Sequence, residues 1–342
     1  MIVTFGGQFG SEGKGLLSSY LASSPLGGDY DVATTDAGPN AGHTAIMEDG
    51  TKVVTFHLPM GGVLKKNCAI YLNGGAIIDP LILTREVSDL DKQGFEVSRR
   101  LIIHPKAAVI RPNDVAAEKA YGSMATRASS TQKGVGTAAA HKILRDGIIV
   151  ETGPHEVAKY AGRVPMDLKS TLIEVAQGFS LGHNTQFYPW TTHRACTPAQ
   201  GIMNASLPTN VPHTVMAVVR VWPIRVGSLP GTTSGGAYPD QKETNWDALG
   251  LEPQYTTVTN RVRRVFNFST EQLISMLTAC NPDVILLNFC NHTTPDHVRD
   301  LDTIIKGCHA AYSALDVRKE PLRMLYGYGP KASDIKTEIQ DE

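Results

Sequence analysis

No two of the five cysteines in this chain are separated by only two residues. The paired CxxC spacing of a structural zinc site is therefore missing, and we expect free thiols in a reducing compartment. An excess of positive charge is missing as well, since 32 Lys and Arg residues stand against 33 Asp and Glu residues. This balance does not suit a nucleic-acid-binding protein, which needs a basic surface.

Long apolar runs are also absent from the sequence. No stretch approaches the roughly 20 apolar residues of a membrane-spanning helix. The first residues, MIVTFGGQ, lack the basic start and the apolar core of a signal peptide. We therefore expect a cytoplasmic protein with no membrane partner and no nucleic-acid partner.

Strand-like and helix-like patterns alternate at both ends of the sequence. Short runs of β-branched and aromatic residues predict strands, and apolar residues spaced by three or four predict helices. The predicted elements are a strand at 2–5, helices in 12–22 and at 80–93, an extended segment at 102–110, a helix opened by a capping box of Ser269 and Gln272, a strand at 283–290, a helix at 296–312 and a strand at 322–328. This alternation predicts an α/β fold with a mostly parallel central sheet flanked by helices. No repeat or boundary divides the chain, so we expect a single domain over residues 1–342.

The segment GGQFGSEGKG at 6–15 directly follows the first predicted strand. It does not match G-x-x-x-x-G-K-[ST], because Gly15 follows Lys14 and Gln8 stands at the first glycine position. It does not match G-x-G-x-x-G either, because no G-x-G opens it. The glycines and Lys14 still favour a phosphate-binding loop, since backbone N–H groups at a helix N-terminus bind anions. A purely structural glycine turn is the alternative.

Three more glycine-rich segments follow, namely DAGPNAGHT at 36–44, HLPMGGVL at 57–64 and LNGGAIIDP at 72–80. Turns of this kind at the ends of parallel strands predict one pocket at the carboxyl edge of the sheet. A long Gly/Pro/Ser/Thr loop, SLPGTTSGGAYP at 228–239, is also typical of a mobile or functional segment. His43 is a candidate for the pocket, although a lone histidine is more often structural.

These segments, together with KGVG, VAQG, YPWTT and RVRR in this order, resemble the adenylosuccinate synthetase family. The corresponding loops of the family are GxQWGDEGKG, NAGHT, HLxPSGIL, GNGVVxxP, RGIGP, EGAQG, YPYVTSS and TTGRxRR. The match runs from residue 3 to about residue 330, and its first two motifs are highly specific. The resemblance implies a fold related to the P-loop hydrolases, a single catalytic domain and a homodimer.

The family reaction accounts for the loops. GTP phosphorylates the 6-oxygen of IMP, and the amine of L-aspartate then displaces that phosphate. Such a reaction needs an aimed γ-phosphate, a magnesium ion and charge stabilisation around the transferred group. The resemblance therefore implies a carbon–nitrogen ligase that depends on Mg²⁺.

The resemblance also assigns residues to sites. The catalytic positions are Ser11, Lys14 and His43. The triphosphate site comprises Ser11, Glu12, Gly13, Lys14, Gly15, Gly42, His43, Thr44, Arg263, Asn288, Asn291, Gly329 and Pro330. The purine monophosphate site comprises Ser11, Asn40, Ser130, Thr131, Gln132, Gln177, Thr192 and Arg145, the last of which would reach the 5′-phosphate in the other subunit of the dimer. The aspartate site comprises Thr257, Val258, Thr259 and Arg261, and the metal would meet Ser11 and the carbonyl of Gly42.

Ser11 is the main departure from the family pattern, which has Asp at this position. In the family, that carboxylate takes the N1 proton of IMP and binds magnesium, whereas a serine hydroxyl is a very weak base. Guanine carries an amino group at C2, next to N1, where hypoxanthine carries only hydrogen. The smaller Ser11 leaves space for that amino group and can accept a hydrogen bond from it. The substitution therefore predicts a guanine nucleotide as the substrate.

The site for the base of the triphosphate departs as well. The family recognises guanine of GTP with a TKLD-like segment, in which Asp accepts two hydrogen bonds. The strand end here is LLNFCNHT at 286–293, where Asn288 and Asn291 are neutral amides that suit the mixed donor and acceptor edge of adenine. The later KASD at 331–334 also replaces an arginine-containing turn. Both changes predict ATP or dATP as the phosphoryl donor, unless the alignment slips by a residue.

Together, these departures resemble the viral branch of the family, whose enzymes join dGMP and aspartate in phages that replace adenine with 2-aminoadenine. Two alternatives remain open at this point. The first is an ordinary compact adenylosuccinate synthetase that acts on IMP. The second is a nucleotide-binding regulatory protein that has lost catalysis, although intact His43, Arg261 and Arg263 argue against it.

Overall fold

The central feature of the computed structural model, which describes residues 1–24, 30–120, 130–163, 170–228, 231–256, 260–313 and 321–341, is a nine-stranded sheet. The strand order is β17 (Ile335–Lys336), β16 (Arg323–Gly327), β15 (Val284–Asn288), β11 (Thr214–Arg220), β1 (Ile2–Gly6), β10 (Thr171–Glu174), β2 (Val32–Thr35), β5 (Ala69–Leu72) and β7 (Leu101–Ile103). All neighbouring strands are parallel except β16 and β17 at one edge. The predicted mostly parallel sheet is therefore confirmed.

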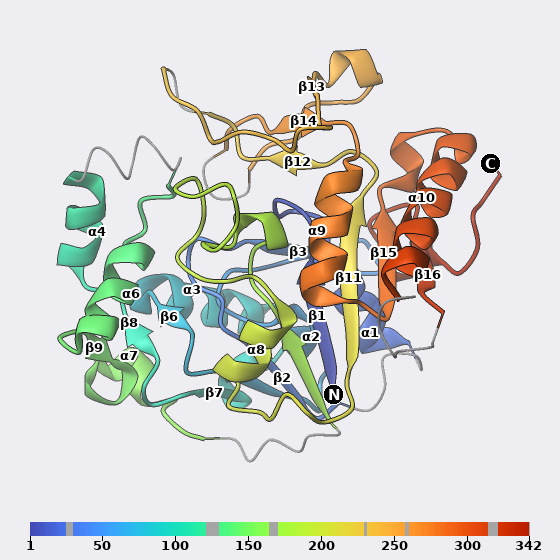
Figure 1. Ribbon diagram of the computed structural model, residues 1–342. Helices are drawn as coiled ribbons and strands as arrows, with labels where there is room; N and C mark the ends of the chain where they lie inside the picture. Colours follow the sequence, from blue (N-terminus) through green and yellow to red (C-terminus); the bar gives the residue numbers. More distant parts are fainter. Residues whose placement is uncertain are drawn as a thin grey trace.

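Helices lie around this sheet (Figure 1). Within the described residues, the α-helices are α1 (Lys14–Ser23), α2 (Met60–Leu64), α3 (Pro80–Lys92), α4 (Pro112–Ala120), α6 (Val135–Leu144), α7 (His155–Ala158), α8 (Pro198–Asn204), α9 (Thr270–Cys280) and α10 (Pro295–Ser313). Short 3-10 turns lie at Val97–Arg99, Val150–Thr152, Phe179–Leu181, Asp247–Leu249, Cys290–His292 and Ala332–Asp334. In Figure 1, α4 and α6 lie at the opposite end of the molecule from α10.

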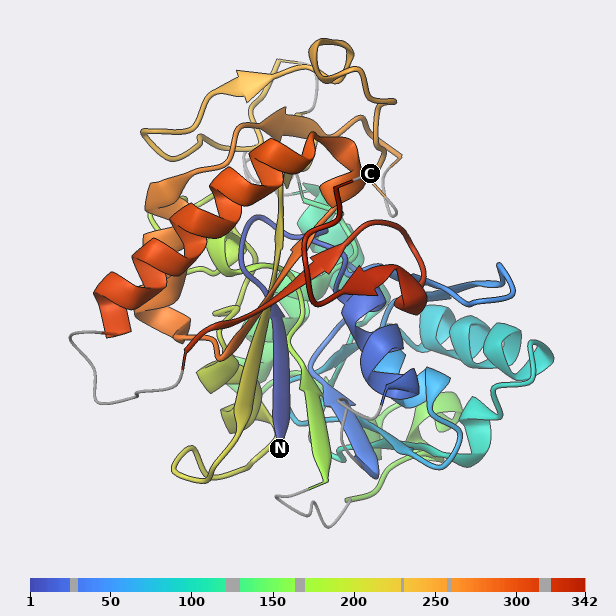
Figure 2. The same cartoon turned by 90° about the vertical axis from the view of Figure 1, so that its right-hand side faces the viewer.

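Three small sheets complete the fold. They are β3 (His43–Ile46) with β4 (Lys52–Thr55), β6 (Ile77–Ile78) with β8 (Ala108–Val109) and β9 (Ile148–Ile149), and β12 (Ile224–Arg225) with β14 (Arg264–Phe266) and β13 (Glu243–Thr244). The last of these lies beyond the carboxyl ends of the central strands (Figure 2). It therefore covers the edge of the sheet at which a ligand site was predicted.

Helix boundaries follow local capping chemistry. Asp79 caps α3, because its Oδ1 accepts the N–H groups of Leu81 and Ile82, each at 3.0 Å. Ser269 caps α9 by accepting the N–H of Gln272 at 2.9 Å. The reciprocal half of the predicted capping box does not form, since the Gln272 amide donates instead to Ser180 Oγ at 2.9 Å. A long-range hydrogen bond in the core has replaced a local one.

The other predicted elements are confirmed with shifts of a residue or two. The exception is 102–110, which divides into β7 and β8 around a turn at His104–Ala107. The segment 228–239 contains no helix or strand at the positions that the structure describes. None of the described helices is both long enough and apolar enough to span a membrane.

β1 lies between β10 and β11; on one side the chain continues from β1 to β2, β5 and β7, and on the other it continues from β11 to β15 and β16. In a parallel sheet, such a switch point opens a crevice outside the carboxyl ends of the strands. The loop after β1 leads directly into this crevice, which is where the phosphate-binding loop was predicted.

Candidate active site

The loop between β1 and α1 has an unusual backbone. Gly10, Ser11 and Gly13 have positive φ angles of 88°, 61° and 95°. A Cβ on Gly13 would overlap the Asn288 amide, and a Cβ on Gly15 would overlap the backbone of Thr44. Glycine is therefore required at 13 and 15 because neighbouring chain segments approach so closely. Ser11 adopts the left-handed conformation without being glycine, which marks it as a residue held by its surroundings.

This loop presents free backbone donors. Among the described residues, no acceptor is bonded to the N–H groups of Glu12, Gly13, Lys14 and Gly15. Consecutive N–H groups at a helix start, with left-handed residues between them, form a concave anion site. The predicted phosphate-binding loop thus has the geometry that its function needs.

Glu12 and Lys14 brace the loop from inside. Glu12 is fully buried, and its Oε1 accepts the N–H groups of Gln8 at 3.1 Å and Gly10 at 2.7 Å. Its other oxygen lies 3.5 Å from Lys14 Nζ. Lys14 Nζ also donates to the carbonyl of Gln177. The ammonium group is thus held at the cavity wall by one carboxylate and one carbonyl.

His43 begins β3, the strand that passes over the start of α1. Burial, with a smaller effect from the nearby charge of Lys14, lowers the pKa of His43 to about 3. The imidazole is therefore neutral at physiological pH when no anion is bound. A neutral imidazole can donate one hydrogen bond to a phosphoryl oxygen.

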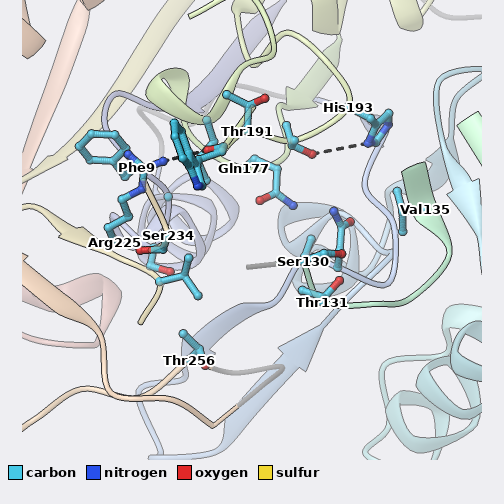
Figure 3. A pocket seen from close by; sticks show the side chains of 18 of the residues that line it. Phe9, Ser130, Thr131, Val135, Gln177, Thr191, His193, Arg225, Ser234 and Thr256 are labelled. Carbon is cyan, nitrogen blue, oxygen red and sulfur yellow. Dashed lines mark hydrogen bonds between the residues drawn. The ribbon is translucent and has the colours of Figure 1, made fainter. Parts of the chain in front are cut away.

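A cavity of about 650 Å³ lies at this edge of the sheet (Figure 3). It brings together ten of the predicted residues, namely Ser11, Lys14, Asn40, Gly42, His43, Ser130, Thr131, Gln177, Thr192 and Arg263. They come from segments spread over most of the chain. One cavity with several convergent polar groups is the arrangement that a ligand-binding or active site requires.

Other predicted residues do not line this cavity. Glu12, Gly13, Gly15, Thr44, Gln132, Arg145, Arg261, Asn288, Asn291, Gly329 and Pro330 are absent from its wall. Gly13, Gly15 and Thr44 form the loop and strand just behind the wall. Thr257, Val258 and Thr259 lie outside the described residues.

The segment that carries Ser130 and Thr131 is anchored by a carboxylate that sequence reasoning missed. The carboxylate of Glu118 in α4 accepts a hydrogen bond from the Ser130 hydroxyl at 2.7 Å and another from the N–H of Gly134. Ser130 Oγ in turn accepts the N–H of Gln132 at 3.0 Å. The Ser130 hydroxyl is thus used to shape the loop, while Thr131 lines the cavity. Glu118 lies only 12 residues before Ser130, but no local motif marks it.

The other end of the cavity is aromatic. Phe9 packs edge-on against Phe187 at 5.0 Å, and Arg225 lies over both rings at 4.6 Å and 5.0 Å. The Arg225 guanidinium donates to the carbonyls of Trp190 at 2.8 Å and Gly236 at 2.7 Å. Burial, together with the charge of Arg264, lowers the pKa of Arg225 to about 10. Sequence reasoning missed Arg225, which contacts the loops of Phe9, Trp190 and Gly236 at this end of the cavity; Phe9 and Arg225 are labelled in Figure 3.

Asn288 at the end of β15 is buried and bonded inside the chain. Its Nδ2 donates to the carbonyl of Glu12 at 2.9 Å, and its Oδ1 accepts the N–H of Phe289 at 2.8 Å. It therefore supports the phosphate-binding loop from below. Recognition of adenine by this amide would require its release from these bonds, whereas Asn291 is exposed.

The predicted metal residues offer few charges. Ser11 and Gly42 supply a hydroxyl and a carbonyl at the cavity wall, and no group of three His, Cys, Asp or Glu side chains within the described residues could hold a metal ion. Magnesium prefers oxygen ligands, keeps several waters and often binds through substrate phosphates. These residues therefore fit a magnesium ion that arrives with a nucleotide, not one that is bound by the protein alone.

Comparison with known proteins gives this site a context. Residues 3–161 match the family model for adenylosuccinate synthetase. The chain is 36% identical to the N6-succino-2-amino-2'-deoxyadenylate synthase of Vibrio phage phiVC8, over 96% of this chain and 95% of that one. It is 31% identical to the adenylosuccinate synthetase of Methanococcus vannielii, over 79% of this chain and 78% of the other.

The chain belongs to the adenylosuccinate synthetase family. The predictions of this family and of a carbon–nitrogen ligase are therefore confirmed. Among solved structures of the family, the chain resembles the succinoaminodeoxyadenylate synthetase of Cyanophage S-2L with a TM-score of 0.82 and 32% identity, over 98% of this chain and 94% of that chain. That structure holds dGMP, with dATP as its energy donor.

Arg145, predicted for the purine monophosphate site, lies at the surface of the protein and not in the cavity. It caps the C-terminus of α6 with a positive φ of 68° and is exposed. The two residues before it, Ile143 and Leu144, expose 79% and 70% of their surface. A cation beside two exposed apolar side chains is typical of a protein interface.

Proposed function

We propose that this protein joins L-aspartate to C6 of dGMP, with ATP or dATP as the phosphoryl donor. The products are N6-succino-2-amino-2′-deoxyadenylate, the nucleoside diphosphate and phosphate. The observation that carries the proposal is the place of Ser11, which lines the cavity at the position where most of the family has Asp. The phage relatives that bear this activity in their names support it.

Ser11 acts here by leaving space. Its side chain is exposed to the cavity, on a backbone conformation that the loop holds in place. A carboxylate at this point would press against the 2-amino group of guanine and leave less room beside N1. A hydroxyl is smaller and can accept a hydrogen bond from that amino group. IMP has no 2-amino group and gains nothing from this space, whereas the change removes the carboxylate that takes the N1 proton of IMP in the family.

The first step transfers the γ-phosphoryl group to O6 of the base; the nucleoside diphosphate leaves, and the N1 proton of the base passes to water. The free N–H groups from Glu12 to Gly15 hold phosphate oxygens, and Lys14 adds a positive charge beside them. Neutral His43 donates a hydrogen bond to the transferring group. A bound Mg²⁺ would neutralise charge on the phosphates, with Ser11 and the Gly42 carbonyl as its protein oxygens. Such positioned charges lower the barrier to phosphoryl transfer.

In the second step, the aspartate amine attacks C6, phosphate leaves with the C–O bond electrons, and the amine loses a proton. The α- and β-carboxylates of aspartate need cations. Arg263 lines the cavity, and Arg261 has a buried Nη1 with no hydrogen-bond partner in the described chain. A guanidinium with a free N–H suits a carboxylate, because it offers two parallel donors. We assign the aspartate to the segment from Thr257 to Arg261.

Two further parts of the proposal concern the surroundings of the site. Arg145 would complete the dGMP site of a second subunit in a homodimer, and its exposed position supports this role. All five cysteines are free, which fits a reducing compartment, and we propose a cytoplasmic location. The whole reaction would take place in one catalytic domain over residues 1–342.

The deciding experiment measures phosphate release with ATP, Mg²⁺ and L-aspartate, using dGMP or IMP as the acceptor, with the mass of each product. We expect release with dGMP and a product that contains an aspartyl group. Release with IMP alone would overturn the proposal and would make the protein an ordinary adenylosuccinate synthetase. Repeating the assay with dATP and with GMP identifies the donor and the sugar.

A further inference from the structure

Arg220 stands at the carboxyl end of β11, in the middle of the central sheet, and is only 2% exposed. Its guanidinium donates three hydrogen bonds, to the carbonyl of Trp222 at 3.1 Å, the carbonyl of Ser11 at 3.0 Å and Gln254 Oε1 at 3.0 Å. It also lies 3.8 Å from the centre of the Phe289 ring. All the printed acceptors are neutral oxygens, so the cation is buried without a hydrogen-bonded carboxylate.

The bond to Ser11 sets the direction of the phosphate-binding loop. In a trans peptide unit, the C=O and the N–H point in opposite directions. When the Ser11 carbonyl points toward Arg220, the N–H of Glu12 must point away from it. That N–H is the first of the free donors at the start of α1. Arg220 thus also supports the positive φ of Ser11, which a non-glycine residue adopts only when its surroundings hold it.

The bond to Gln254 leads to a different part of the site. The main-chain carbonyl of Gln254 accepts the N–H of Arg263 at 2.8 Å, and Arg263 Nε donates to the carbonyl of Tyr255 at 2.9 Å. Arg263 lines the cavity. One guanidinium therefore connects the loop that holds the triphosphate to the backbone of Arg263 at the cavity wall, two residues after Arg261.

The backbone of Arg220 is itself fixed. Gln8 Oε1 accepts its N–H at 2.9 Å, and Gln8 Nε2 donates to its carbonyl at 3.3 Å. The guanidinium therefore projects from a rigid point. Its planar fork can bond in several directions at once, which a lysine ammonium on a flexible stem cannot reproduce.

We propose that Arg220 is a positioning residue that fixes the phosphate-binding loop and the backbone of Gln254 and Arg263 relative to each other. The inference rests on the proposed function. Arg220 does not line the cavity, so it acts through Ser11 and Gln254. Its charge, which no hydrogen-bonded carboxylate neutralises, also adds positive potential where anionic substrates gather.

Four variants test this role. Arg220→Lys keeps a cation without the fork, and Arg220→Met removes both. Gln254→Leu removes only the hydrogen bond that connects Arg220 to the Gln254–Arg263 backbone. Arg100→Lys is the matched control, because Arg100 is another largely buried arginine that donates only to carbonyls, those of Gly62, Val63, Lys65, Cys68 and Phe95, away from the cavity.

Two kinetic readouts separate positioning from stability. The first is scrambling of ¹⁸O from the β–γ bridge of ATP in the presence of dGMP and Mg²⁺ without aspartate, which reports reversible phosphoryl transfer alone. The second is the KM for aspartate in the full reaction. Thermal unfolding of each variant gives its stability separately.

We expect both Arg220 variants to slow scrambling by about 100-fold, the usual cost of a small misplacement of reacting groups. Gln254→Leu should keep scrambling within about threefold and raise the KM for aspartate about tenfold, the loss of roughly one hydrogen bond. Arg100→Lys should lower the unfolding temperature without changing either readout.

Arg220 variants that lose stability like Arg100→Lys, with normal scrambling, would overturn the inference while leaving the proposed function intact. If the Arg220 variants do not fold, a normal aspartate KM in Gln254→Leu would overturn it. A wild-type protein that does not scramble with dGMP would overturn the proposed function and the inference together.

Discussion

Lys14 Nζ and Glu12 Oε2 lie 3.5 Å apart in a loop where Glu12 has no exposed surface. The carboxylate holds the ammonium on the cavity side and at the same time accepts two backbone N–H groups of its own loop. The buried Glu12 carboxylate therefore positions the Lys14 ammonium that is proposed to contact the phosphates.

Glu12→Gln should weaken both folding and triphosphate binding. An amide is almost the same size and its oxygen can still accept both backbone N–H groups, but its NH₂ group would face the Lys14 ammonium, which loses its counter-charge. Removing one partner of a buried pair costs about 3–5 kcal/mol. Urea unfolding measures this loss, and ATP titration measures the affinity. Glu48→Gln, at an exposed hairpin position, is the control and should change neither greatly; equal behaviour of the two variants would contradict the role of Glu12.

Ser11→Asp should lower the turnover of dGMP and bring some turnover of IMP. The expected fall is one to two orders of magnitude, since a misplaced reacting group costs about 100-fold. Steady-state kinetics with both nucleotides provide the measurement. Ser11→Ala distinguishes the steric effect from the hydrogen bond, because it leaves the space for the 2-amino group and removes the hydroxyl. Unchanged dGMP kinetics in Ser11→Asp would contradict the proposal that Ser11 makes space for the 2-amino group.

His43→Ala should lower kcat far more than it weakens nucleotide binding, because the proposed hydrogen bond belongs to the transition state. We expect a loss of about 100-fold to 1,000-fold in kcat, the usual value for one stabilising donor. Equal falls in affinity and kcat would make His43 a binding residue. Equilibrium titration of the variant with dGMP and with ATP gives the affinities independently of turnover.

His43 also predicts how stability depends on pH. Its pKa in the folded state, about 3, lies below the ordinary value of 6.5. As the pH falls below 6.5, the unfolded chain takes up a proton that the folded chain does not, so the free energy of unfolding decreases. One such proton is worth about 1.4 kcal/mol per pH unit. Between pH 6 and pH 5, the wild type should lose about that much more stability than His43→Asn, as measured by urea unfolding at each pH.

The parts of the site that could be predicted share one property, which is that local sequence encodes them. The glycines at 13 and 15 are needed for close approach, and NAGHT forms the adjacent turn and strand, so both motifs are visible in a short window. The central sheet follows from strand–helix alternation for the same reason. These features required no knowledge of which distant segments meet.

The missed residues act across the fold. Arg220 is 209 residues from Ser11, and Arg225 is 35 residues from Trp190. In the sequence, each is an arginine at the end of an apolar run, where an exposed charge is the ordinary expectation. Only the parallel pairing of β1 with β11 brings Arg220 under the phosphate-binding loop. Asn288 illustrates the same limit, because its bond to Glu12 joins residues 276 positions apart.

Ile143→Glu should disrupt the proposed homodimer. Ile143 and Leu144 expose most of their surface directly before Arg145, the residue assigned to the neighbouring site. A carboxylate buried in an apolar interface is costly, so we expect a monomer by light scattering and a loss of about tenfold or more in kcat/KM for dGMP. Leu81→Glu is the control, because Leu81 is 72% exposed at the start of α3 and has no assigned partner role. The prediction fails if Ile143→Glu remains a dimer, or if a fully active monomer shows that Arg145 serves no second subunit.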